Sequence, residues 1–246
     1  MTDISQALIY AIFAILPGLI WLFFFLNKDD HSEPKRVILR VFILGMLMTV
    51  PVFFVEYSLL DLLDKLNLKT DLYYFIQYFF VVALTEELFK YLAFRFGAQK
   101  SQFLDEPIDV PIYMIVAALG FATAENVVLF SQKTFQFLIE PVSLSILRFV
   151  GANFLHALCS GIFGFYMAVS FYRTNKRTFL FWGGFLIAII LHGIFDFFLK
   201  YSIIEHGGET ELTPIVVVIV TALIVSYILL REALKKLKRL KTICKI

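Results

Sequence analysis

Long apolar stretches alternate with short polar ones along the whole chain. Seven of the apolar stretches are long enough to cross, as helices, the roughly 30 Å hydrocarbon core of a bilayer. They cover about residues 4–26, 37–60, 72–96, 108–130, 142–171, 178–201 and 213–230. The pattern predicts an all-α fold, a polytopic transmembrane helical bundle of about seven spans. We expect residues 1–230 to form this single bundle and residues 231–246 to form a basic tail.

Two of these stretches have distinctive features. No Lys or Arg precedes residues 4–26, so this segment lacks the basic start of a signal peptide, and we expect a retained first helix. Residues 142–171 form more helix than a bilayer needs at about 1.5 Å per residue. We therefore expect this fifth segment to tilt, break or protrude.

Composition agrees with membrane insertion. Hydrophobic residues make up 60% of the chain and charged residues 17%, against about 25% charged residues in average soluble proteins. Cys159 and Cys244 lie in different surroundings, so no disulfide framework is expected. The basic tail has no nucleic-acid recognition motif and adjoins a membrane helix, so we expect no nucleic-acid partner.

The positive charges are distributed unevenly about the predicted spans. Sixteen Lys and Arg residues fall on one side and only four on the other. The positive-inside rule then places the N-terminus outside and the C-terminus in the cytoplasm, in a multi-pass protein of the cell (inner) membrane. The tail resembles a stop-transfer anchor. Alternatively, it lies on anionic lipid, because its Leu and Ile residues alternate with Lys and Arg.

Ionisable residues inside the apolar segments are the strongest functional signal. A charge at the bilayer centre costs about 2.5–3.5 kcal/mol on insertion scales. Four segments nevertheless carry such residues: Glu86, Glu87 and Lys90; Glu125; Arg148 and His156; His192 and Asp196. Each must avoid lipid, so we expect them to converge on one interior site. In a purely structural alternative, Glu86 and Glu87 pair with Lys90 and only brace the bundle.

These residue types suit hydrolysis. A carboxylate in a low-dielectric pocket can act as a general base on water, and histidines can donate hydrogen bonds to an oxyanion. Glu86 or Glu87 with His156 and His192 is therefore a candidate hydrolytic set. Asp196 follows His192 by four residues, so its carboxylate can orient the imidazole. The same residues could instead bind zinc, although the chain has no HExxH pattern.

Other functions fit the pattern less well. The chain has no G-x-S-x-G motif for a serine triad, and we expect Cys159 to pack as a small apolar residue rather than act as a nucleophile. A proton- or ion-coupled transporter could use buried Glu, His and Asp, but no obvious inverted repeat is present. A catalytically inactive scaffold would not need the combined acids and imidazoles.

Four motifs resemble, in order, those of the PrsW family of intramembrane proteases. LTEELFK resembles the EExxK element of that family, and GFATAEN resembles its GFAxxEN element. HALCSGIFG resembles its HxxxTGIxG element, with Ser160 in place of Thr. HGIFD resembles its HGxWD element, with Phe195 in place of Trp. The resemblance covers most of the chain through the sixth segment.

The resemblance implies a membrane-embedded endopeptidase related to the CAAX prenyl endopeptidase and bacteriocin-processing group. That superfamily is described as glutamate-dependent, and its members were formerly classed as metalloproteases. Glu86 would activate water with help from Glu87, while His192 and His156 would support the oxyanion. Asp196 would orient His192.

Further expectations concern Glu125, cofactors and partners. By the same resemblance, Glu125 is an additional site residue. We expect no cofactor; if zinc is bound instead, its ligands are Glu86, His156 and His192. Family members cleave membrane-bound anti-sigma factors in stress signalling, which makes a membrane protein, such as a single-pass anti-sigma factor, the expected substrate. The lipid bilayer is the other expected partner.

Overall fold

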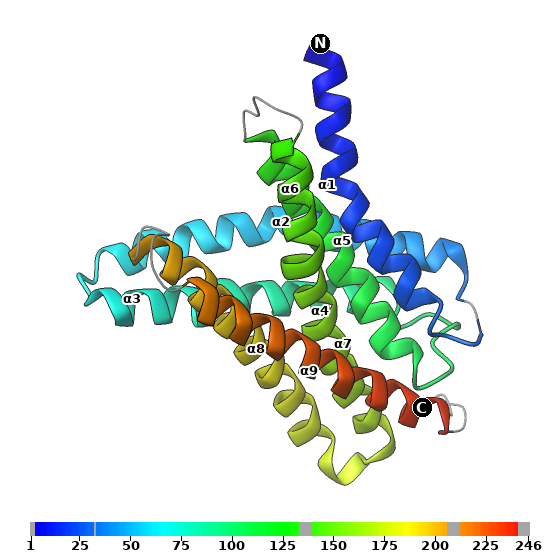
Figure 1. Ribbon diagram of the computed structural model, residues 1–246. Helices are drawn as coiled ribbons and strands as arrows, with labels where there is room; N and C mark the ends of the chain where they lie inside the picture. The colour runs from blue at the N-terminus through cyan, green and yellow to red at the C-terminus, as the bar shows by residue number, and fades with distance from the viewer. Residues whose placement is uncertain (1–2, 32, 133–138, 206–211, 241–246) are drawn as a thin grey trace.

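The computed structural model describes residues 3–31, 33–132, 139–205 and 212–240, and no strand occurs in these ranges. The α-helices are α1 (Asp3–Leu26), α2 (Lys35–Asp64), α3 (Thr70–Ile76), α4 (Leu84–Gly97), α5 (Asp109–Ser131), α6 (Ile139–Arg148), α7 (Phe154–Tyr172), α8 (Arg177–Glu205) and α9 (Leu212–Lys238) (Figure 1). Two π-helical turns, η1 (Gln77–Ala83) and η2 (Phe149–Asn153), join α3 to α4 and α6 to α7, and a 3-10 turn, η3 (Thr174–Lys176), precedes α8.

The predicted spans agree closely with these helices, and the helical membrane bundle is confirmed. Six segments of the described chain are long and apolar enough to cross a membrane: 5–26, 35–64, 70–97, 109–131, 139–171 and 177–199. The predicted seventh segment corresponds to α9, which continues past Leu230 to Lys238, so the first half of the basic tail is helical. Cys244 and the rest of the tail after residue 240 lie outside the described residues.

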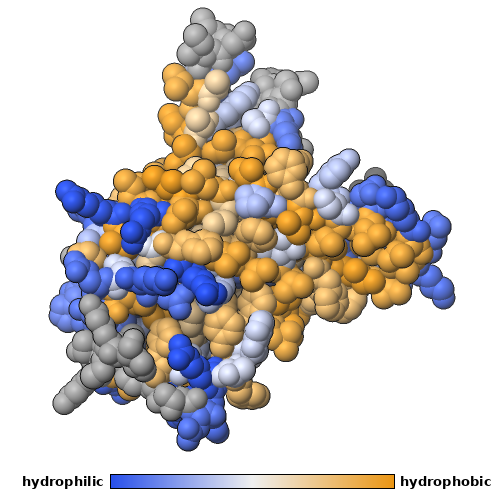
Figure 2. Space-filling model, turned by 180° about the vertical axis from the view of Figure 1, so that it is seen from behind, coloured by the Kyte–Doolittle hydropathy of each residue, from blue (hydrophilic) through white to orange (hydrophobic). Residues whose placement is uncertain are grey.

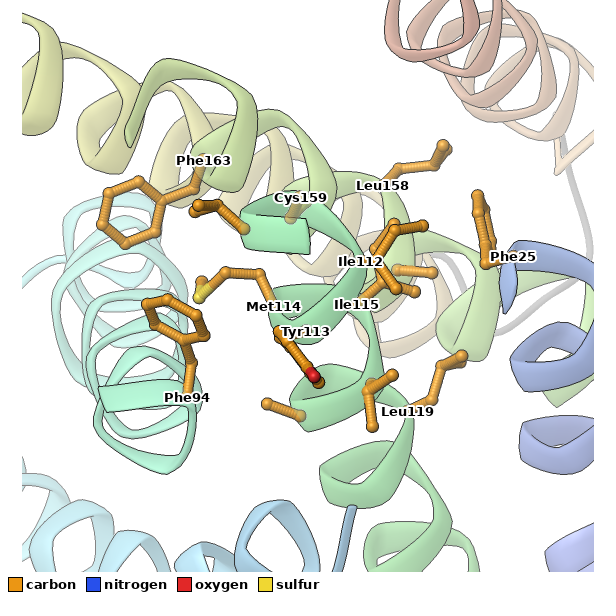
Figure 3. Close-up of a cluster of buried hydrophobic side chains, with 14 of the residues drawn as sticks. Phe25, Phe94, Ile112, Tyr113, Met114, Ile115, Leu119, Leu158, Cys159 and Phe163 are labelled. Atoms are coloured by element: carbon orange, nitrogen blue, oxygen red, sulfur yellow. The ribbon is translucent and has the colours of Figure 1, made fainter. Parts of the chain in front are cut away.

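Helix α5 forms the centre of the bundle and is buried along nearly its whole length. Large side chains from neighbouring helices surround it, including Phe25 of α1, Phe94 of α4 and Phe163 of α7 (Figure 3). Cys159 lies fully buried in the same cluster. This packing fixes the helices that carry the polar residues.

Two glycines allow α2 and α5 to pack backbone against backbone. A Cβ atom on Gly120 would lie 2.1 Å from the carbonyl oxygen of Phe42, and a Cβ on Gly45 would lie 2.1 Å from that of Ala117. Neither position can therefore hold a larger residue without separating the helices.

The fifth segment breaks its α-helical pattern at η2, which lies directly before the turn that carries His156. Trp21 of α1 donates a hydrogen bond from Nε1 to the carbonyl oxygen of Phe149, at 2.8 Å. Its ring also stacks on Phe149 and Phe154, with centroid distances of 4.9 and 4.4 Å. Helix α1 thus fixes the π turn, a feature that is often found at functional sites.

Polar contacts join three chain segments at one end of the bundle. His31 pairs with Glu106 at 2.7 Å, and Lys238 pairs with Asp30 at 2.8 Å. The loops after α1 and α4 and the end of α9 therefore meet there, far from the start of α1 (Figure 1). With seven predicted spans and a cytoplasmic C-terminus, the loops after the first and third spans and the basic tail are all expected on the basic side. Much of the surface seen from behind is hydrophobic, with hydrophilic side chains gathered toward its margins (Figure 2).

Candidate active site

The structure brings the six predicted site residues together from four helices. They are Glu86 and Glu87 in the first turn of α4, Glu125 in α5, His156 in α7, and His192 and Asp196 in α8. Five of the six are buried, and Glu125 is partly exposed. The convergence expected from the cost of charge in lipid therefore appears in the geometry, and its centre is Lys90.

Lys90 is fully buried and contacts three site residues. Its Nζ lies 3.0 Å from Oε2 of Glu86, 2.9 Å from Oε1 of Glu87 and 2.6 Å from Nδ1 of His156. Its ammonium also lies 4.9 Å from the centroid of the Phe121 ring, within cation–π range. An ammonium has three donors and no acceptor, so Nδ1 of His156 must accept. The proton of the neutral imidazole is then on Nε2.

A second set of contacts leads from His156 toward the edge of the bundle. His156 Nε2 donates to Oε2 of Glu125 at 3.1 Å, and Arg148 Nη2 donates to the same oxygen at 2.9 Å. Arg148 also donates from Nε to Oδ1 of Asn126. Side-chain exposure rises from 0% at Lys90 to 4% at His156 and 27% at Glu125, and it is 19% at Arg148. The buried centre thus has a polar connection to the partly exposed residues.

Glu87 anchors the second histidine. His192 Nδ1 lies 3.0 Å from Oε1 of Glu87, and Ser160 Oγ donates to Oε2 of Glu87 at 3.3 Å. The other nitrogen, Nε2, lies 3.6 Å from Glu86 Oε2 and 3.7 Å from Asp196 Oδ2, both longer than a hydrogen bond. Glu87, rather than Asp196, therefore makes the carboxylate hydrogen bond to His192 in this geometry.

The two adjacent glutamates differ in how many of their carboxylate oxygens have contacts. Both oxygens of Glu87 have partners, as described above. Among the described residues, the contacts of Glu86 with Lys90, His156 and His192 all reach Oε2. Its Oε1 has no such contact, so Glu86 is the better placed of the pair to meet a substrate or water.

Sequence reasoning grouped Lys90 and Arg148 with the residues expected to converge but gave neither a role in the candidate hydrolytic set. Lys90 contacts three of the predicted site residues. Its four-residue spacing from Glu86 was the signal that could have given it such a role. Arg148 was noted as a charge within a span, but nothing in the sequence paired it with Glu125.

The donor set also suits a metal ion by residue type and spacing. One ligand atom each from Glu86, His156 and His192 lies within 4.8 Å of the others, and two imidazoles with a carboxylate are a common set for catalytic zinc. Lys90 contacts two of these three side chains, at Glu86 Oε2 and His156 Nδ1. A cation that used these atoms would have to displace the ammonium.

Comparisons with known proteins agree with the motif order. Residues 33–228 match the family described as PrsW family intramembrane metalloprotease. Protease PrsW of Oceanobacillus iheyensis is 32% identical over 186 residues, 76% of this chain and 80% of the relative. Protease PrsW of Clostridioides difficile is 32% identical over 211 residues, 84% of each chain. That of Geobacillus kaustophilus is 31% identical over 75% of this chain and 77% of the relative. No solved structure matches the chain.

Proposed function

The chain belongs to the PrsW family of intramembrane proteases, and we propose that it cleaves its substrate by a glutamate-activated water at the Lys90-centred site. The observation that supports this most strongly is the meeting of Glu86, Glu87, His156 and His192, from three helices, around one buried ammonium. A transmembrane helix that serves only as an anchor has no need of such groups.

In the proposed reaction, a water molecule lies against Glu86 and attacks the scissile carbonyl carbon. The carboxylate takes one water proton as the C–O bond forms and the carbonyl π pair moves onto oxygen. The resulting oxyanion accepts a hydrogen bond from Nε2 of His192 when that nitrogen is protonated. The C–N bond then breaks, and protonated Glu86 returns the proton to the leaving amine.

The remaining residues position these groups. Glu87 holds His192 through Nδ1 and thereby directs Nε2 toward Glu86. Lys90 keeps the two glutamates together and fixes the tautomer of His156. Glu125 and Arg148, which are partly exposed, would admit water, and the Glu125 carboxylate would exchange protons with it. Asp196 lies beside His192 and adds negative charge near the imidazole.

Zinc is an alternative within the same site. Glu86, His156 and His192 would hold it, and the ion would act as a Lewis acid on the scissile carbonyl. An ion that used Glu86 Oε2 and His156 Nδ1, the atoms that Lys90 contacts, would require its ammonium to withdraw first.

We further propose a membrane-protein substrate, with a single-pass anti-sigma factor as the candidate class, because the family resemblance implies it. The proposed orientation puts the N-terminus outside and the C-terminus in the cytoplasm. It is supported by the distribution of Lys and Arg and by the meeting of the loops after α1 and α4 with the end of α9.

The test is cleavage of a single-pass membrane substrate by the purified protein in detergent, with products identified by mass spectrometry. We expect the wild-type protein to cut within or beside the transmembrane segment and His192→Ala to be inactive. His31→Ala changes an exposed histidine outside the site and should retain activity. Wild-type protein that cuts nothing but carries a proton flux in proteoliposomes would replace this proposal with the transporter hypothesis.

A further inference from the structure

A pocket opens where the last turns of α9 pack against the end of α1. We name it the end pocket; its lining residues are Phe25, Lys28, Tyr227, Leu230, Arg231, Leu234, Lys235 and Lys238. Its volume is about 240 Å³, or about eight times the roughly 30 Å³ that a water molecule occupies in the liquid. None of its lining residues belongs to the Lys90-centred site, and the pocket plays no part in the proposed hydrolysis.

The lining of the end pocket is divided into an apolar floor and a cationic rim. Phe25, Leu230 and Leu234 are buried and form the floor. The rim is provided by four basic side chains, those of Lys28, Arg231, Lys235 and Lys238. A ligand that satisfies both parts must carry negative charge at one end and hydrocarbon at the other.

Two of the four cations already have carboxylate partners. Lys235 pairs with Glu232 at 2.7 Å, and Lys238 pairs with Asp30 at 2.8 Å. Within the described chain, Lys28 and Arg231 pair with no carboxylate. Lys28 instead lies over the Phe24 ring, 4.4 Å from its centroid. The rim therefore holds two positive charges that form no ion pair in the described chain, one from each side of the pocket.

We propose that the end pocket binds the headgroup of an anionic phospholipid, with the phosphate between Lys28 and Arg231. Guanidinium and ammonium groups are the usual phosphate partners in proteins. The pocket lies at the end of an apolar helix, where a headgroup meets hydrocarbon, and the acyl chains would continue over the apolar floor. The apolar residues of the early tail are buried against the protein, so the lipid binds between α1 and α9 rather than beneath a free tail.

The bound lipid would also hold α9 in place. Tyr227 of the pocket contacts Phe24 of α1 and Phe154 of α7, with centroid distances of 6.2 and 5.8 Å. Phe154 lies two residues before His156, so the end pocket connects through one aromatic pair to the helix that carries the site histidine. Lipid binding itself does not depend on the proposed proteolysis.

The test is native mass spectrometry of the full-length protein, delipidated in detergent and then offered equal amounts of phosphatidylglycerol and phosphatidylcholine. We expect the wild-type protein to retain phosphatidylglycerol in preference to phosphatidylcholine. Lys28→Gln with Arg231→Gln should bind phosphatidylglycerol about thirtyfold more weakly, the effect of two charges at a membrane surface. Lys35→Gln with Arg36→Gln removes the same charge from positions outside the pocket and should bind as the wild type does.

Thermal unfolding in detergent with phosphatidylcholine alone verifies that both double variants fold. Equal retention of the two lipids by the wild-type protein would overturn the proposal. So would undiminished phosphatidylglycerol binding by the folded Lys28 and Arg231 double variant. Displacement of the lipid by added inorganic phosphate would also overturn it, because the site would then recognise free phosphate.

Discussion

Nζ of Lys90 and Nδ1 of His156 lie 2.6 Å apart, although 66 positions separate the two residues in the chain. This contact joins α4 to α7 at the centre of the site and leaves Nε2 of His156 to donate to Glu125. The same ammonium compensates two adjacent glutamates that are both buried. Both the stability of the fold and the proposed chemistry therefore depend on Lys90, and mutations can test the two roles separately.

Replacing Lys90 should be far more costly than replacing an exposed lysine with the same spacing. Lys90→Met leaves buried carboxylates without their cation, which typically costs about 3–5 kcal/mol. Lys65 is the matched control: it pairs with Asp61, four positions before it, at 2.6 Å, and both are exposed. Lys65→Met should cost less than about 1 kcal/mol. Unfolding free energies in mixed micelles provide the comparison, and equal losses would contradict a buried ion cluster.

Arg148 should act as a positioning residue. It binds Glu125 through Nη2 and Asn126 through Nε, and a lysine cannot make this forked contact. We expect Arg148→Lys and Arg148→Gln to lower kcat by about 10–100-fold, as for other residues that orient site ligands, with little change in KM. Steady-state kinetics on the membrane substrate measure kcat and KM separately. Arg40→Gln, at an exposed position, is the control and should leave kcat unchanged; a rise in KM alone for the Arg148 variants would point to substrate binding instead.

Trp21 should couple α1 to the π turn that precedes His156. Trp21→Phe keeps a stacking ring but removes the Nε1 donor to Phe149, which should cost about 0.5–1.5 kcal/mol of stability. Because the turn sets the direction of α7, we also expect slower cleavage. Trp182→Phe, at an exposed position, should change neither quantity. If both variants behaved like the wild type, the hydrogen bond to the π turn would have no role.

A carboxylate cluster at the end of the bundle should make stability depend on pH. Burial raises the pKa of Glu33 above its ordinary value, and the charge of Asp29 adds to the rise while the hydrogen bond from Tyr113 opposes it. Burial likewise raises the pKa of Asp29. The folded state thus keeps protons that the unfolded state has lost, so stability falls as pH rises above the ordinary carboxyl range.

Glu33→Gln should remove its share of this dependence. Between about pH 5 and about pH 8, the Tm of the variant should fall less than the wild-type Tm. Asp61→Asn removes an exposed carboxylate elsewhere and should keep the wild-type slope. A steeper fall for Glu33→Gln would reverse the assigned sign.

The sequence was sufficient to predict the spans and the grouping of their polar residues, because the cost of charge in lipid acts on each helix separately. It could not show which side chains touch. Four-residue spacing put Asp196 on the same face as His192, but helix rotation brings Glu87 from α4 to Nδ1 of that histidine. The packing of α4 against α7 likewise brings Lys90 into contact with His156, which the sequence does not show. The π turn η2 is held by its contact with Trp21, which no local pattern contains.

The most direct test of the proposed hydrolysis is the single-turnover cleavage rate of Glu86→Gln. The glutamine keeps the size of the side chain and an oxygen for Lys90, so the fold should survive, but it cannot accept a proton from water. We predict a rate at least about 100-fold below that of the wild type, with thermal unfolding close to that of the wild-type protein. A folded Glu86→Gln protein that cleaves at the wild-type rate would contradict the assignment of Glu86 as the base.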